Sequence, residues 1–145
     1  MKLVVKDSVK TDKFITLFKN LQQVCDTVTI QFTEEKMYIQ SMDSHHVCMV
    51  EIQLSNEWFD TYEIDGDDIN TISTNTSIFQ CILKCKDQSQ QITMQYSGDP
   101  DTLDISFTEG ETGTFDKYFE MPLITIEHDV LHDLPIVTGK QKCLC

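Results

Sequence analysis

The segment TDKFITLFKNLQQVC (residues 11–25) decides the fold class. Its apolar residues recur at the three- and four-residue spacing of one helix face. They are Phe14, Leu17, Phe18, Leu21, Val24 and Cys25. Thr11 or Asp12 is placed to cap the first turn. We therefore predict an amphipathic helix that packs its apolar side on a sheet.

Strand patterns surround this helix, and the same order then recurs. The expected strands of the first half are residues 2–7, 27–32, 37–42 and 47–54. In the second half, an extended run at 58–72 precedes a helix at 76–85 and strands at 91–96, 101–107 and 117–124. Ile78 should lie on the apolar side of this second helix, and Gln80 on the polar side. The order β-α-β-β-β, present twice, predicts an α+β fold with two helices packed on antiparallel sheets.

The composition is that of an ordinary globular protein. The chain has 145 residues, 40% of them hydrophobic, which suits one domain. No apolar run approaches the roughly 18 residues of a membrane span. The net charge is −13, with eleven lysines and no arginine. This charge alone argues against nucleic-acid binding, unless the lysines gather on one face.

The segment IQSMDSHHVCMVEI (residues 39–52) contains four candidate metal ligands or acid–base groups, namely Asp43, His45, His46 and Cys48. Alternate residues of a strand point to opposite sides, so these four side chains would divide two and two. A tetrahedral metal site needs a different spacing. The spacing therefore favours a strand-turn-strand with polar residues in the turn, with a metal site as the alternative.

Other candidate sites have a weaker pattern. His128 and His132 are four residues apart, but Pro135 and the aperiodic flanks argue against a helix there. Cys81 and Cys85 have the same spacing and no third ligand nearby in the sequence. The six cysteines include no C-x-x-C pair and are interpreted as reduced thiols. No catalytic motif is present, so we expect no enzyme, no metal and no cofactor.

The pattern of helices and strands ends near residue 125. The segment IEHDVLHDLPIVTGKQ (126–141) has no clean period and is typical of an extended connector. We predict a domain at 1–125, a connector at 126–139 and the possible start of a missing second domain at 140–145.

Five segments, taken in order, resemble the N-terminal half of the proliferating cell nuclear antigen (PCNA) family of DNA sliding clamps. They are QSMDSHHV (40–47), FDTYEID (59–65), ILKC (82–85), DTLDISF (101–107) and FEMPL (119–123). The resemblance covers about residues 1–136. It implies the DNA-clamp fold and a processivity factor for DNA polymerase in DNA replication, including leading-strand elongation, and in DNA repair. Such a ring encircles duplex DNA without a catalytic step or cofactor.

The resemblance also implies partners. These are double-stranded DNA held by non-specific phosphate contacts, DNA polymerase and other proteins with PCNA-interacting peptides, and a clamp loader. A complete subunit would form a homotrimer. The expected location is the nucleus, or a viral replication site in the cytoplasm for a virus-encoded chain. Two alternatives remain: a single-domain peptide-binding module that closes no ring, and an enzyme built from the His, Asp and Cys residues.

Three sets of residues are candidates for these contacts. The DNA-facing set lies on or beside the polar helix faces: Lys10, Lys13, Lys19, Lys84 and Lys86. A solvated helix surface is the alternative for these lysines. The resemblance implies a partner-peptide groove formed by Met42, His46, Val47, Met49, Leu131, Leu134, Pro135 and Ile136. Pro122 places the last strand at a sheet edge. The resemblance makes this edge a subunit contact, formed by Lys117, Tyr118, Phe119, Glu120 and Met121.

Overall fold

The computed structural model describes residues 1–43, 45, 47–64, 70–96 and 101–124. The first half of the chain forms β1 (Lys2–Val5), α1 (Ser8–Val24), β2 (Thr27–Phe32), β3 (Lys36–Met42) and β4 (Met49–Ser55). A 3-10 turn η1 (Asn56–Trp58) and the short strand β5 (Thr61–Glu63) follow. The second half forms β6 (Asn70–Asn75), α2 (Thr76–Leu83), β7 (Gln91–Gln95), β8 (Thr102–Thr108) and β9 (Lys117–Pro122).

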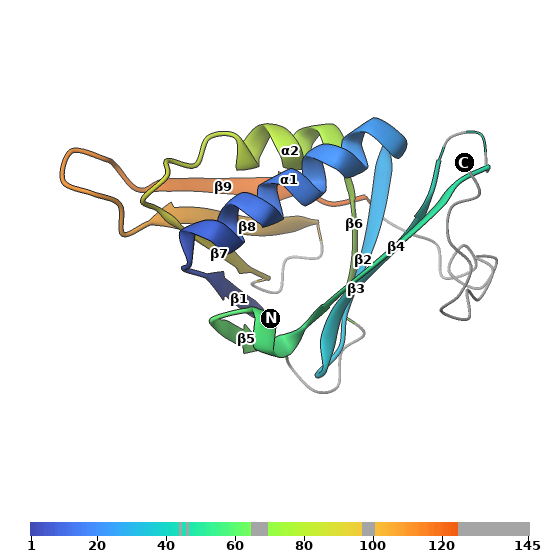
Figure 1. The fold of residues 1–145 in the computed structure, drawn as a ribbon, viewed down its shortest axis with the longest axis horizontal. Coiled ribbons are helices and arrows are strands. Elements are labelled where there is room, and N and C mark those ends of the chain that lie inside the picture. The colour runs from blue at the N-terminus through green and yellow to red at the C-terminus, as the bar shows by residue number, and fades with distance from the viewer. Residues whose placement is uncertain (44, 46, 65–69, 97–100, 125–145) are drawn as a thin grey trace.

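The strands form two antiparallel sheets. β1, from the first half of the chain, belongs to the sheet of the second half, and β6, from the second half, belongs to the sheet of the first. One sheet has the order β5-β1-β7-β8-β9, and the other has the order β4-β3-β2-β6. Thus β1, from the first half, pairs with β7 of the second half, with Lys2 opposite Gln95. In return, β6 pairs with β2, with Ile72 opposite Ile30. The predicted α+β class is confirmed, and the exchange interlocks the two halves (Figure 1).

The two helices lie side by side on one side of the sheets (Figure 1). Their contact is aromatic, since the ring centroids of Phe18 and Phe79 are 4.3 Å apart. Phe14 extends this cluster, with its ring 5.0 Å from that of Phe18. All three side chains are almost fully buried. Each of them removes a large apolar area from water, so this cluster fixes the helices on the sheets.

The first helix begins earlier than the sequence predicted. Its N-cap is Asp7, whose carboxylate accepts hydrogen bonds from the backbone N–H groups of Val9 and Lys10, at 2.8 and 3.1 Å. The predicted caps, Thr11 and Asp12, lie inside the first turns. Thr11 is buried and donates its hydroxyl to the Ser8 carbonyl. The prediction of the cap was therefore wrong by one turn.

The second helix is capped by Asn75, whose side-chain oxygen accepts from the N–H groups of Ser77 and Ile78. It ends at Leu83, two residues before the predicted end. Two predicted orientations were wrong. Gln80 is buried rather than solvated, and Ile78 is 41% exposed rather than part of the core.

The extended run predicted at 58–72 is divided, since Trp58 ends η1 before β5 begins at Thr61. Cys25, Cys81 and Cys85 are free thiols, but Cys48 is disulfide-bonded, so the prediction that every cysteine is reduced was wrong there. Within the described residues, no helix has the length and apolarity needed to span a membrane.

Candidate functional site

The exposed sides of α1 and α2 form a helical face that carries free positive charge. Lys13, Lys19 and Lys84 are exposed, and in the described part of the chain no hydrogen bond or ion pair engages their ammonium groups. Within these two helices, Asp12 is the only acidic residue. Three of the five predicted lysines therefore present unpaired charge on one face of an otherwise acidic chain.

The other two predicted lysines are engaged inside the domain. The Lys10 ammonium donates to the Trp58 carbonyl at 2.9 Å and lies 5.7 Å from the centre of the Trp58 ring. The Lys86 ammonium donates to the Asp87 carbonyl at 2.8 Å. Burial lowers the pKa of Lys86, because the charged form loses hydration. These two lysines offer less to an external phosphate than the other three.

The part of the predicted groove that the structure describes lies between β3 and β4. We call its described residues, 42, 43, 45 and 47–49, the methionine turn. Met42 and Met49 stand opposite each other in the strand register. Val47 is 65% exposed at the tip. Exposed or half-exposed Met and Val side chains suit an apolar contact that adapts to its partner. The other predicted groove residues, His46, Leu131, Leu134, Pro135 and Ile136, lie outside the described residues.

Asp43 holds this turn closed. Its carboxylate accepts from the backbone N–H groups of Val47 and Cys48 at 2.7 and 3.0 Å. The Cys48 N–H is the largest cause of the lowered pKa of Asp43, because these bonds favour the ionised form. Among the described residues, no three His, Cys, Asp or Glu side chains gather as a metal-ligand group. Asp43 thus has a structural role in the turn.

The strand β9 lies at an edge of the five-stranded sheet, as Pro122 predicted. The Leu123 N–H donates to the Asp101 carbonyl at 2.8 Å, so these two residues form a hydrogen-bonded pair of the β8–β9 ladder. Hydrogen-bonded and non-hydrogen-bonded pairs alternate along an antiparallel ladder. Residues 117, 119 and 121 therefore direct their backbone groups toward β8, and residues 118 and 120 direct theirs outward. Pro122 occupies an outward position, where its missing N–H costs no ladder bond.

The side chains of β9 alternate in the same way. Met121 is buried, Phe119 is half-buried, and Tyr118 is 75% exposed on the opposite face of the sheet. An open hollow of about 610 Å³ lies beside this edge, and the sequence did not predict it. It is lined by Thr93, Gln95, Asp104, Ile105, Ser106, Tyr118, Phe119 and Glu120. Within the described residues, the edge therefore offers outward backbone groups beside an open hollow of mixed polar and apolar lining.

Comparison with known proteins shows the family to which this chain belongs. Residues 8–132 match the family model described as proliferating cell nuclear antigen, N-terminal domain. This chain belongs to the PCNA N-terminal domain family. The recognition of a PCNA-type clamp domain is thereby confirmed.

Curated PCNA relatives are longer than this chain. It is 30% identical over 124 residues to "DNA polymerase sliding clamp 1" of Thermococcus kodakarensis, covering 86% of this chain and 46% of that protein. It is also 30% identical over 134 residues to "Probable DNA polymerase sliding clamp 2" of Paramecium bursaria Chlorella virus 1, covering 90% and 49%. The chain thus spans about half the length of the curated PCNA relatives it matches.

Solved PCNA structures share the fold. PCNA from Thermococcus kodakaraensis aligns with a TM-score of 0.74 at 19% identity, covering 86% of this chain and 46% of that one. The PCNA2–PCNA3 complex from Sulfolobus tokodaii aligns with a TM-score of 0.75 at 18% identity, covering 88% and 48%. At these identities, the likeness establishes the fold alone.

Proposed function

We propose that this chain is the N-terminal domain of a DNA sliding clamp, a non-catalytic processivity factor for DNA polymerase. In a closed ring of such subunits, the helical face would line the hole and the sheets would face outward. Enclosure of the duplex would then retain the clamp, so each contact with DNA could be weak and independent of sequence.

The observation that carries this proposal is the distribution of charge on the helices. The chain has a net charge of −13, yet Lys13, Lys19 and Lys84 stand unpaired on the helical face. A solvated surface of so acidic a chain would be expected to carry more acids than lysines, whereas Asp12 is the only acidic residue of these two helices. Ammonium groups gathered on one face suit the phosphates of duplex DNA.

The other two surfaces support contacts with proteins. We assign the methionine turn to one lip of a groove for PCNA-interacting peptides of DNA polymerase and other partners. We assign the outward edge of β9 to the contact with a neighbouring subunit, because an uncovered strand edge is a template for pairing. A clamp loader and a nuclear or viral replication site remain parts of this proposal.

The test is a chimera that joins this chain to the remaining half of the Thermococcus kodakarensis clamp. We expect it to support processive synthesis by the cognate polymerase. Replacing Lys13, Lys19 and Lys84 by glutamate should shorten the products, most clearly at low salt. The loss relative to the original chimera should narrow as salt rises, because fewer phosphate contacts displace fewer counterions and the salt dependence becomes shallower. The matched control changes Lys2, Lys6 and Lys36, which lie outside the helices, by the same total charge.

The two triple variants separate a DNA-facing role from a general charge effect. Equal losses in both would mean that only the total charge matters, and no loss in the first would refute the helical assignment. The alternative, a peptide-binding module that closes no ring, predicts peptide binding at the methionine turn and no processivity in the chimera.

A further inference from the structure

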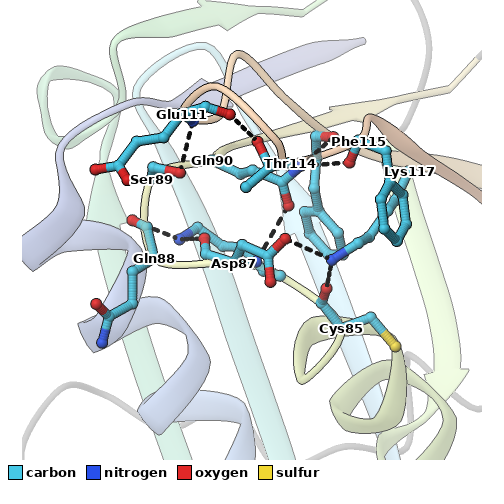
Figure 2. A network of polar contacts seen from close by, with 11 residues as sticks. Cys85, Asp87, Gln88, Ser89, Gln90, Glu111, Thr114, Phe115 and Lys117 are labelled. Atoms are coloured by element: carbon cyan, nitrogen blue, oxygen red, sulfur yellow. Dashed lines mark hydrogen bonds and ion pairs between the residues drawn. The ribbon is translucent and has the colours of Figure 1, made fainter.

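Gln90, a buried residue in the loop between α2 and β7, links three segments of the chain (Figure 2). Gln90 is only 1% exposed and precedes β7. Its amide nitrogen donates to the carbonyls of Phe107, in β8, and Phe115, just before β9, at 3.3 and 2.8 Å. Its amide oxygen accepts from the Asp87 N–H at 3.1 Å. The loop after α2 is therefore tied to the β8–β9 connection.

The β8–β9 connection packs tightly against this glutamine. A Cβ at Gly110 would lie 2.1 Å from the Thr114 hydroxyl oxygen and 3.1 Å from the Gln90 side chain. The Glu111 N–H donates to the Ser89 hydroxyl at 2.9 Å, across the same contact. A side chain at Gly110 would displace Thr114 and Gln90. This close packing fixes the position of the β8–β9 connection just before β9 begins.

Lys117, the first residue of β9, completes the link to the helix (Figure 2). Its ammonium group donates to the Cys85 carbonyl, just beyond the end of α2, and to the Asp87 carboxylate at 3.0 Å. It also lies 5.1 Å from the centre of the Phe115 ring. A cation is favoured at a helix C-terminus, where the carbonyls carry partial negative charge. We call this set of contacts the Lys117 bridge.

The bridge engages a residue that the resemblance assigned to the subunit edge. The side chain of Lys117 is only 15% exposed and is directed to the helix layer. Tyr118, the next residue, points to the opposite face and is 75% exposed. Lys117 therefore belongs to the edge strand β9, but its ammonium group is directed to α2 and not to a neighbouring subunit.

We propose that Lys117 is a positioning residue that couples the end of α2 to the edge strand β9. The inference rests on the proposed function, because it links the helical face, which would contact DNA, to the edge that would contact the neighbouring subunit. A shift of α2 on DNA would then be transmitted to the edge that meets the neighbour. Charge-assisted hydrogen bonds give such a link its strength and direction.

The test is amide hydrogen exchange by NMR on the full chain, which needs neither DNA nor a partner. In Lys117→Met, we expect about tenfold faster exchange at Cys85 and Lys86, whose N–H groups bond within the last turn of α2, and at Phe119 and Met121. Tenfold corresponds to about 1.4 kcal/mol of opening free energy. Ile30 and Ile39, in the other sheet, should keep their rates.

Two further variants complete the design. Lys117→Arg should restore protection at both segments, because its guanidinium can donate to both acceptors. Lys36→Met is the matched control, since Lys36 also bonds a side chain (Gln53, 3.0 Å) and lies 5.5 Å from an aromatic ring. It should change neither segment. Faster exchange at only one segment, an equal rise at Ile30 and Ile39, or no rescue by arginine would overturn the coupling. The coupling and the chimera can fail independently.

Discussion

Asp43 is the residue on which the shape of the methionine turn depends. Replacing it with alanine removes the acceptor of the Val47 and Cys48 N–H groups. We expect the turn to open and a PCNA-interacting peptide to bind several-fold more weakly. Titration of such a peptide, followed by NMR shifts at Met42 and Met49, measures this. Shifts confined to the helices would refute the assignment of the groove.

The same carboxyl group gives the turn a defined pH dependence. The pKa of Asp43 is lowered in the folded protein, chiefly by the Cys48 N–H. Its contribution is therefore complete above the ordinary carboxyl pKa and is lost as the pH falls through the lower folded value. The Val47 and Cys48 amides should lose protection in acid. Asp43→Asn, which cannot ionise, should remove this pH dependence, and a variant that keeps it would contradict the assignment.

Tyr62 connects the two sheets and should respond to alkaline pH. Its hydroxyl donates to the Thr33 carbonyl at 2.6 Å, and burial raises its pKa to about 12. The stabilisation is present below pH 10 and is lost as the pH rises toward 12, because the folded state disfavours the anion. Tyr62→Phe should cost about 1 kcal/mol in urea unfolding at neutral pH.

The exposed Tyr118 provides the control for this prediction. Tyr118→Phe should leave the free energy of unfolding within about 0.5 kcal/mol of the original at neutral pH. The difference between the original chain and Tyr62→Phe should shrink between pH 10 and 12. A difference that stays constant across this range would show that the phenol does not titrate there.

At the scale of elements, α1 should depend on its true cap. Asp7→Ala should cost about 1 kcal/mol of unfolding free energy, because two N–H groups of the first turn lose their acceptor. Asp12→Ala is the control, since Asp12 is exposed and caps nothing. Urea unfolding of both variants decides between the two positions. A larger cost for Asp12→Ala would support the cap predicted from the sequence.

The helices and most strands could be predicted because their signals are local. The spacing of Phe14, Phe18 and Leu21 fixes one helix, and β8 alternates buried and half-buried residues along its whole length. The cap was missed because capping residues are dense from Asp7 to Asp12. Several sites could start the helix, and only packing selects one of them.

What could not be predicted depends on residues far apart in the sequence. Gln80 is polar and fits a solvated face by its spacing, yet tertiary packing buries it. The ammonium groups of Lys10 and Lys117 find acceptors 48 and 32 residues away. Such contacts leave no periodic signal. The candidate surfaces were therefore located by resemblance, and the structure divides their lysines into free and engaged groups.

For the whole molecule, we expect a monomer of 16.7 kDa, or weak association through the β9 edge. Light scattering over a range of concentrations measures this. Any rise in mass should disappear in Glu120→Pro, because residue 120 directs its N–H outward and proline blocks edge pairing without breaking the β8 ladder. A stable trimer of this chain would contradict the prediction, as would association that survives the substitution.

The exchange of β1 and β6 between the sheets also governs how the chain folds during synthesis. β1 leaves the ribosome before its partner β7, which follows about ninety residues later in the sequence. At roughly 5 to 20 residues per second, β1 waits about 5 to 20 seconds for that partner. Contacts so distant in sequence also make folding slow. During that interval the apolar side chains of β1 lack their partners in β7, and neither half of the chain can complete a sheet alone.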